Sequence, residues 1–170
     1  MGKLIIIEGT DGSGKQTQTE LLCKKLKEIK GGNNVKKISF PNYESRSSEP
    51  VKMYLAGEFG KTAESVNAYA ASVLYSVDRF ASFKTEWEEF YNNGGIVISD
   101  RYTISNMIHQ IPKILEKSER EKYLDWLIDL EWSKIQIPKP DIVFFLDIPF
   151  EFSQKLMKDR ENKITGEKEK

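Results

Sequence analysis

The sequence of 170 residues predicts a three-layer α/β/α fold around a central parallel sheet. Three observations predict this fold. Short runs of β-branched residues alternate with longer segments of helical periodicity, which is the pattern of parallel strands joined by helical crossovers. The first and third runs are apolar without alternation, as expected of strands that are buried on both faces. A glycine-rich loop joins the first run to the first helical segment.

The expected elements follow one another from strand to helix along the chain. Strands are expected at residues 4–7, 35–40, 96–98 and 142–146. Helices are expected at residues 15–29, 51–55, 64–92, 105–135 and 149–160, with a break near Pro112. Glycine, asparagine or proline ends most of these segments, as in folds with short connections.

The helix expected at 64–92 carries two distinct faces. Its apolar stripe consists of Val66, Ala70, Val73, Val77, Phe80 and Ala81, and such a stripe normally packs on the core. Another face carries Tyr75, Asp78, Arg79 and Ser82. A ring beside a guanidinium suits a planar base, because the ring stacks and the arginine donates to a carbonyl. The spacing alone is more typical of a solvated face.

Composition excludes several function classes. Lys and Arg together number 26, as do Asp and Glu, so the basic bias of a nucleic-acid-binding protein is missing. The single cysteine, Cys23, cannot form an internal disulfide and is expected to be buried, which fits a reducing cytoplasmic setting. The apolar run at 4–7 is too short for a signal segment or a membrane span. We therefore expect a cytoplasmic protein that binds neither nucleic acid nor membrane.

A phosphate-binding loop follows the first strand. Residues 9–15 fit the pattern G-x-x-x-x-G-K, in which glycines turn successive backbone N–H groups toward phosphate oxygens. The helix that begins near Lys15 adds its positive end, and the Lys15 ammonium can reach the β- and γ-phosphates. The residues assigned to ATP binding are Gly9, Thr10, Asp11, Gly12, Ser13, Gly14, Lys15, Gln16 and Thr17.

The residue after Lys15 departs from the usual pattern. Gln16 stands where a serine or threonine hydroxyl would bind Mg²⁺, and Thr17 lies about 100° further round the helix. The Gln16 carbonyl oxygen is a weaker Mg²⁺ ligand. If Gln16 is not a ligand, phosphate, water and a carboxylate would hold the metal instead. The metal candidates are Gln16 and Asp100.

Asp100, Arg101 and Tyr102 come directly after the third strand. Ligands bind at that edge of open α/β sheets. Arg101 can clamp a phosphate in bidentate fashion, and Asp100 can approach a metal or its waters. In the alternative interpretation, Asp100 and Arg101 form a purely structural ion pair. The nearby phosphate loop favours the interpretation in which they bind ligands. Phe40, beside Pro41, and the only histidine, His109, are more typical of packing or surface positions than of a site.

Together these residues resemble the thymidylate kinase family over essentially the whole chain. The matching segments are residues 8–18, 40–41, 74–79, 100–102 with Ser105 and Gln110, 140–147 and 159–168. Glu8 and Asp11 are far more specific to the family than the loop alone. The resemblance implies a P-loop fold, ATP and Mg²⁺ as cofactors, and phosphoryl transfer to thymidine 5′-monophosphate (dTMP).

The resemblance also implies roles for single residues. Lys15, Asp11, Arg101 and Arg160 would be catalytic. Asp11 would bind the 3′-hydroxyl of the acceptor sugar, and Arg101 would hold the acceptor phosphate. The substrate-binding set would be Asp11, Phe40, Tyr75, Arg79, Arg101, Ser105 and Gln110, with Tyr75 and Gln110 packing on thymine and Arg79 donating to its exocyclic carbonyl.

The tail from about residue 158 resembles the start of the family's lid. Members with glycine at the Gly12 position usually supply a catalytic arginine from the lid, so Arg160 is the candidate, and Lys163 a lesser one. Family chains continue past this point. We expect a single kinase domain over 1–170 that lacks its C-terminal part. Family members are commonly homodimers, so the resemblance implies a homodimer.

Three alternatives remain at the level of sequence. A deoxynucleoside kinase would need a carboxylate to deprotonate a 5′-hydroxyl, and no extra carboxylate stands out. Another nucleoside monophosphate kinase would share the loop. A catalytically inactive nucleotide-binding module is the alternative of another class. A GTPase is not favoured, because the segment 162–165 lacks the aspartate of a guanine-reading motif.

Overall fold

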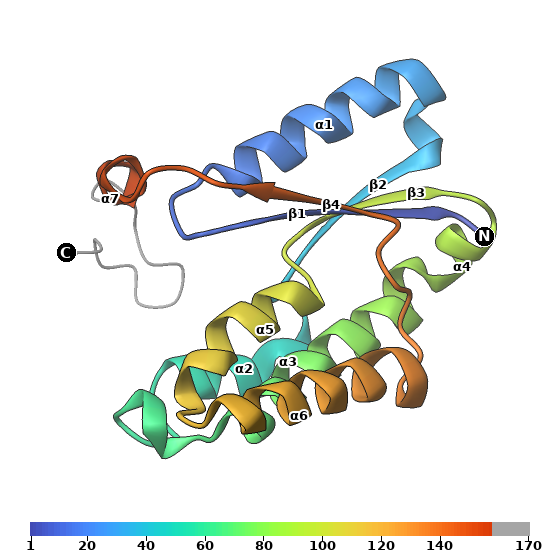
Figure 1. Ribbon diagram of the computed structural model, residues 1–170. Helices are drawn as coiled ribbons and strands as arrows, with labels where there is room; N and C mark the ends of the chain where they lie inside the picture. Colours follow the sequence, from blue (N-terminus) through green and yellow to red (C-terminus); the bar gives the residue numbers. More distant parts are fainter. Residues whose placement is uncertain (158–170) are drawn as a thin grey trace.

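The computed structural model describes residues 1–157 of the chain (Figure 1). In these residues the centre is a four-stranded parallel sheet with the strand order β2-β3-β1-β4. The strands are β1 (Lys3–Gly9), β2 (Val35–Ser39), β3 (Ile96–Asp100) and β4 (Ile142–Leu146). Strand β1 pairs in parallel with both β3 and β4, and β2 pairs with β3. The four expected strands and their parallel arrangement are confirmed.

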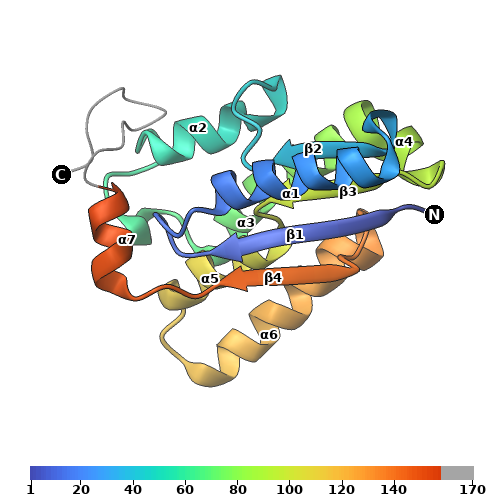
Figure 2. The same ribbon diagram turned by 90° about the horizontal axis from the view of Figure 1, so that it is seen from above.

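Helices cover both faces of this sheet, which confirms the three layers. Helix α1 lies on one face, and α3, α5 and α6 lie on the other (Figures 1 and 2). The helices are α1 (Lys15–Lys30), α2 (Glu49–Leu55), α3 (Ala68–Ser82), α4 (Glu88–Asn92), α5 (Thr103–Gln110), α6 (Lys117–Ile128) and α7 (Phe150–Met157). Among them, none has the length and apolar character that crossing a membrane requires.

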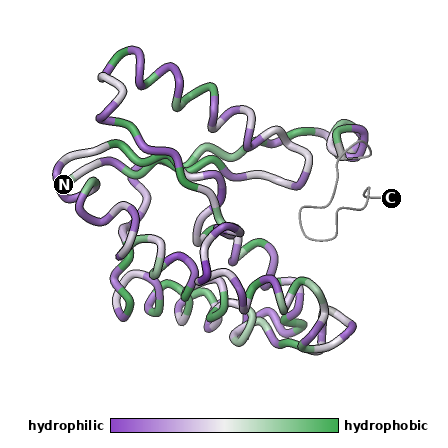
Figure 3. The backbone as a smooth tube through the Cα atoms, turned by 180° about the vertical axis from the view of Figure 1, so that it is seen from behind, coloured by the Kyte–Doolittle hydropathy of each residue, from purple (hydrophilic) through white to green (hydrophobic). Residues whose placement is uncertain are grey.

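The central strands divide their side chains between two apolar clusters. Leu4 and Ile6 point to the α3 side, and Ile7 points to the α1 side, where it meets buried Cys23. Full burial of one such leucine or isoleucine stabilises the fold by about 1.5–3 kcal/mol. Figure 3 shows the hydrophobic residues gathered along these strands. Strand β4 is more open, with Phe145 51% exposed.

The segment expected as one helix over 64–92 is divided. Helix α3 begins only at Ala68, because the Asn67 side chain caps it by accepting a hydrogen bond from Ala70 N at 2.8 Å. A π-helical segment, Phe83–Trp87, then separates α3 from α4. Such a wide turn shifts the residues after it to another face of the helix.

The expected packing of α3 is wrong. Val73, Val77 and Phe80 of the apolar stripe are 41–48% exposed. The opposite face is buried although it is polar, with Asp78 1% and Arg79 2% exposed. Their polar groups bond to residues from distant segments, which is the condition for burying them. The solvated-face interpretation is therefore wrong as well.

Candidate active site

The loop after β1 has the backbone of a phosphate cradle. Gly12 and Gly14 have φ of 76° and 83°, a left-handed conformation that glycine adopts without steric cost. A Cβ at Gly9 would lie 2.8 Å from the Leu146 carbonyl oxygen, so a side chain is excluded there. No side chain caps the start of α1 at Gly14. Its first N–H groups are thus available to an anion.

Lys15 lies folded over this loop. Its side chain is 6% exposed, its Nζ donates to Thr10 O at 2.6 Å, and Asp11 Oδ1 lies 4.0 Å away. Burial and, next, the charge of Arg101 lower the pKa of Lys15 to about 8. The ammonium is therefore still charged at neutral pH but is held in a poorly solvated position. Such a cation gains strongly from a phosphate ligand.

The remaining loop residues differ in their surroundings. Ser13 Oγ is buried and has no hydrogen-bond partner within residues 1–157, so a phosphate oxygen could satisfy it. Thr10 and Thr17 are exposed. Gln16 is exposed too, and its Nε2 donates to Glu20 Oε1 at 3.2 Å along α1. The structure therefore shows the Gln16 amide engaged on its own helix.

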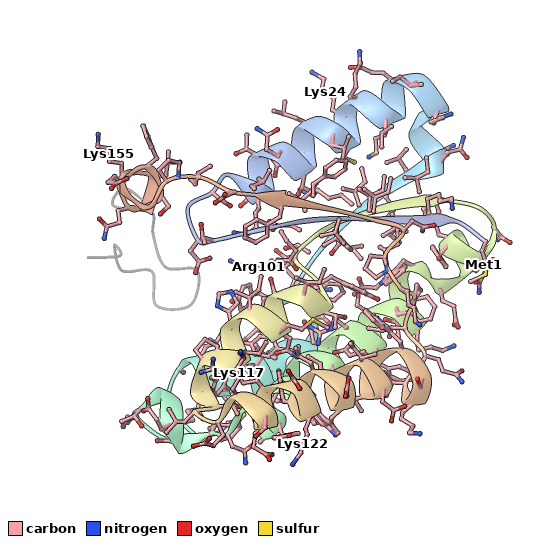
Figure 4. The ribbon with its side chains drawn as sticks, viewed as in Figure 1. Met1, Lys24, Arg101, Lys117, Lys122 and Lys155 are labelled. Carbon is pink, nitrogen blue, oxygen red and sulfur yellow. The ribbon has the colours of Figure 1, made fainter. Side chains whose placement is uncertain are left out.

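Arg101 stands across from the loop at the end of β3. Its backbone N donates to Ile7 O at 3.1 Å, which ties the turn to β1. Its Nη2 pairs with Asp11 Oδ1, and its Nη1 donates to Ser105 Oγ at 3.1 Å. Figure 4 shows Arg101 between the sheet and α5. The expected phosphate-loop aspartate and phosphate-clamping arginine are thus in direct contact.

Glu8 organises the Arg101 turn, a role that the sequence analysis did not assign. Its carboxylate is fully buried. Oε1 accepts hydrogen bonds from Tyr102 N at 2.9 Å and Ser105 N at 3.0 Å, and Oε2 accepts from Ser105 Oγ at 2.7 Å. Burial raises the pKa of Glu8, while these bonds and Arg101 oppose the rise. The feature of the sequence that could have indicated this role is a charged residue at the end of an apolar strand.

His109 also belongs to this cluster. Its Nε2 lies 3.2 Å from Arg101 Nη1, one turn of α5 beyond Ser105. Burial and the Arg101 charge lower the pKa of His109 below its usual 6.5. The ring is therefore neutral at pH 7, and Nε2 accepts a hydrogen bond from the guanidinium. His109 is exposed, which agrees with the expected surface position, but its contact with Arg101 was not expected.

Aromatic residues lie on the α3 side of Arg101. Tyr75 and Tyr54 meet edge to face, with ring centroids 6.2 Å apart, and Lys113 Nζ donates to Tyr54 Oη at 2.7 Å. Burial raises the pKa of the Tyr75 hydroxyl. Tyr54 and Lys113 were missed by the sequence analysis, since neither belongs to a motif. Phe40 is 4% exposed and packs on Tyr102 at a centroid distance of 5.9 Å, so it belongs to the core in this structure.

The buried polar face of α3 bonds to two distant segments. Arg79 pairs with Glu131 of the π-helical segment Asp129–Lys134. Asp78 accepts from Asn42 N at 2.8 Å and from Ser47 Oγ at 2.7 Å. Gln110, on α5, is 3% exposed, and its Oε1 has no hydrogen-bond partner among the described residues.

Asp100 ends β3 beside the phosphate loop, and its charge favours the protonated form of Lys15. Across residues 1–157, no three His, Cys, Asp or Glu side chains gather closely enough to hold a metal ion. Phosphate and water oxygens would therefore supply most ligands of a magnesium ion at this edge. Arg160, Lys163 and the expected lid lie outside the described residues.

Comparisons with known proteins agree on one family. The family model described as thymidylate kinase matches residues 7–170. A thymidylate kinase of Mycobacterium tuberculosis is 30% identical over 164 residues, covering 96% of this chain and 74% of that protein. A crystal structure of thymidylate kinase from Ehrlichia chaffeensis superposes with a TM-score of 0.64 at 27% identity, covering 91% of this chain and 76% of the other. The thymidylate kinase of Candida albicans has a TM-score of 0.70 at 26% identity, with coverage of 95% and 69%.

Proposed function

The chain belongs to the thymidylate kinase family, and from this premise we propose that it transfers the γ-phosphoryl group of ATP to dTMP, giving dTDP and ADP. One observation carries the proposal. The phosphate loop with Lys15 and the Arg101 turn meet at the same sheet edge, where Asp11 and Arg101 are in contact. A donor on the loop would therefore face an acceptor phosphate on Arg101 across a short gap.

Catalysis here needs positioning and charge neutralisation rather than a strong base. The acceptor phosphate is already ionised at neutral pH, and phosphoryl transfer asks the protein mainly to align the groups and stabilise charge. Lys15 and the N–H groups at the start of α1 would hold the donor phosphates. Arg101, aimed by Glu8 and Ser105, would hold the acceptor phosphate.

Magnesium would neutralise charge on the donor phosphates. Asp100 is the carboxylate that we assign to this position, because it ends β3 beside the phosphate loop and its charge acts on Lys15. Gln16 would join only if its amide left Glu20. We therefore favour a metal held mainly by phosphate and water oxygens, with Asp100 acting directly or through water.

The acceptor would lie along α3 and α5. Asp11 would exchange its pair with Arg101 for the 3′-hydroxyl of the sugar when the acceptor phosphate arrives. Tyr75 would stack on the base, Gln110 would bond to it through the unpaired Oε1, and Arg79 would donate to its exocyclic carbonyl. Phe40 would contribute indirectly, by packing behind the residues that form the pocket wall. Arg160 of the lid would complete the catalytic set.

An acceptor panel tests the proposal. With ATP and Mg²⁺, the monophosphates of thymidine, deoxyuridine, uridine, cytidine and adenosine are compared with thymidine itself. We expect dTMP to be the best acceptor, and thymidine to be inert. Transfer to thymidine would favour a deoxynucleoside kinase, and ADP release that no acceptor stimulates would favour an inactive nucleotide-binding module.

Two variants link activity to the site. Lys15→Ala and Arg101→Ala should each lower kcat/KM by at least about 10²-fold, because each removes a charge that faces a transferring phosphate. Lys122→Ala, at an exposed position on α6, is the matched control and should behave as the unaltered protein. Normal turnover by either site variant would contradict the assignment.

The assembly and setting are proposals of the same kind. We propose a homodimer, supported by the exposed apolar residues Val73, Val77 and Phe80 on one face of α3. We also propose a cytoplasmic protein, supported by the single cysteine, and one kinase domain over 1–170 with its lid from about residue 158.

A further inference from the structure

The most deeply buried ion pair of the described chain joins Arg79 to Glu131. Arg79 is 2% exposed, and Glu131 is fully buried. Arg79 Nε donates to Glu131 Oε2 at 3.1 Å, and Nη2 donates to Oε1. The carboxylate also accepts from Ser76 Oγ at 2.6 Å and from Thr103 Oγ1 at 3.3 Å. One side chain thus connects α3, the first turn of α5 and the segment that follows α6.

Stability alone does not account for this pair. Removing two charges from water costs several kcal/mol for each ion, and well-packed apolar residues of similar volume are often as stable or more stable. A buried ion pair is therefore weak evidence of a stabilising role. A different requirement must favour a charged donor at this position.

The geometry of the guanidinium suggests that requirement. The group is planar and carries five N–H donors in a fixed fork. Glu131 takes Nε and Nη2, and Ser76 also accepts from Nη2 at 3.4 Å. Nη1 takes part in none of these bonds. Because the guanidinium is rigid, its hydrogen bonds to Glu131 along one edge set the direction in which the Nη1 hydrogens point.

The surroundings of this pair match a pyrimidine base. Tyr75 stands one helical turn before Arg79, and the charges of both Arg79 and Arg101 act on its hydroxyl. On the facing helix α5, Gln110 Oε1 and Asn106 Oδ1 are buried with no hydrogen-bond partner among the described residues. A base with a carbonyl and a ring N–H is recognised by three kinds of group. These are an aromatic ring that stacks on it, a donor that points at its carbonyl, and an acceptor for its N–H.

We propose that Glu131 is the positioning residue that aims Arg79 Nη1 at the exocyclic carbonyl of the acceptor base, and thereby sets base selectivity. The inference rests on the proposed function, since it assigns the base to the α3–α5 side of Arg101. Glu131 touches no substrate in this arrangement. Its effect passes through the direction and charge of Arg79.

The test compares two acceptors in the Glu131→Gln variant. The first is dTMP. The second is 5-methyl-2′-deoxycytidine monophosphate, which has the same methyl group but an amino group in place of the relevant carbonyl and no hydrogen on the adjacent ring nitrogen. We expect the variant to lose about tenfold in kcat/KM for dTMP, mainly through KM, because one charge-assisted hydrogen bond is misdirected. Use of the amino analogue should change by less than about twofold, so selectivity falls by about the same factor.

Two further variants separate positioning from folding. Asp129→Asn makes the same chemical change on the same π-helical segment, at an exposed pair with Lys134, and should leave selectivity unchanged. Ser76→Ala removes a neutral partner of Glu131 without unbalancing charge, so it should give a smaller loss in the same direction. This variant carries the test if Glu131→Gln does not fold. Melting temperature and calorimetric binding of both monophosphates are measured for each protein.

The outcomes separate the inference from the proposed function. A positioning role is supported if the loss is confined to dTMP. A purely structural role would lower the melting temperature and reduce the use of both acceptors equally, and that result would overturn the inference. If the unaltered protein did not phosphorylate dTMP at all, the proposed function would fail first, and the binding measurements would still show whether Glu131 controls the preference between the two bases.

Discussion

At the scale of single residues, the most constrained position is Arg101. Its φ is 66°, a left-handed conformation that costs about 1–2 kcal/mol for a residue with a side chain. Two hydrogen bonds hold the turn. The Arg101 N–H donates to Ile7 O, and the Tyr102 N–H donates to the Glu8 carboxylate. The strain therefore persists because Glu8 and β1 overdetermine the turn, which fixes the direction of the guanidinium.

The first prediction concerns Glu8. In Glu8→Gln an amide replaces the carboxylate that accepts three hydrogen bonds, so the Ser105 hydroxyl loses its charged acceptor and the two backbone N–H groups bond to a neutral oxygen. We expect a loss of about 1–3 kcal/mol in the free energy of unfolding, together with a raised KM for dTMP as the Arg101 turn loosens. Urea unfolding and steady-state kinetics measure both effects. Glu121→Gln, exposed on α6, is the control, and equal behaviour of the two variants would refute the role of Glu8.

The second prediction is the pH dependence that Lys15 imposes. Its pKa of about 8 lies below the ordinary value, so the cation is present below pH 8 and is lost as the pH rises through 8. Because kcat/KM for ATP reports the free enzyme, it should fall above pH 8, approaching tenfold per pH unit. A Lys15→Arg variant stays charged and should lack this decline. A flat profile in the unaltered protein between pH 7 and 9.5 would contradict the prediction.

Contiguous site residues could be predicted from the sequence, and residues joined over long distances could not. Residues 9–15 form a motif because one loop must wrap one phosphate chain. Glu131 and Arg79 are 52 positions apart, and the sequence around either residue does not indicate that the two pair. His109 was missed for a different reason. It lies only eight positions from Arg101, but their contact depends on the rotation of α5 relative to the turn.

At the scale of elements, the strands were predicted more accurately than the helices. Runs of β-branched residues bounded by glycine and proline leave little freedom, so strand bounds agree within about two residues. Helix α3 shows why periodicity misled. The hydrophobic pattern identifies two faces but cannot tell which one meets the core, and here the polar face is inside because Glu131 and the segment 42–47 supply its partners.

The third prediction follows from that inverted face. Asp78 holds the segment after β2 through Asn42 N and Ser47 Oγ. Asp78→Ala removes the charged acceptor of the part-buried Asn42 N–H and of the Ser47 hydroxyl, so we expect a loss of about 1–3 kcal/mol in unfolding free energy. Amide hydrogen exchange should accelerate at residues 42–48 and much less in the central strands. Asp125→Ala, exposed on α6, is the control, and unchanged exchange at 42–48 would show that Asp78 does not hold the segment.

At the scale of the whole molecule, the sheet assembles the site. Asp11 and Arg101 are 90 positions apart, yet the register that pairs Ile7 with Asp100 brings the two turns to the same edge. A parallel pairing of this kind needs a long crossover, here the whole segment from α1 through α4. The site therefore forms only when the sheet has formed. The exposed apolar residues of α3 take no part in it and remain available for contacts between molecules.

The last prediction concerns those contacts. Val73, Val77 and Phe80 lie at successive turns of α3 and are 41–48% exposed, an arrangement that suits packing of the helix against its own copy around a twofold axis. In Val77→Glu a carboxylate would be buried beside the same group of the partner, and one unpaired buried charge is costly enough to prevent association. We expect the unaltered protein to sediment as a dimer and the variant as a monomer at equal concentration in analytical ultracentrifugation. Leu115→Glu, at a residue that is 87% exposed and away from α3, should remain dimeric, whereas a monomeric unaltered protein at high micromolar concentration would refute the proposed assembly.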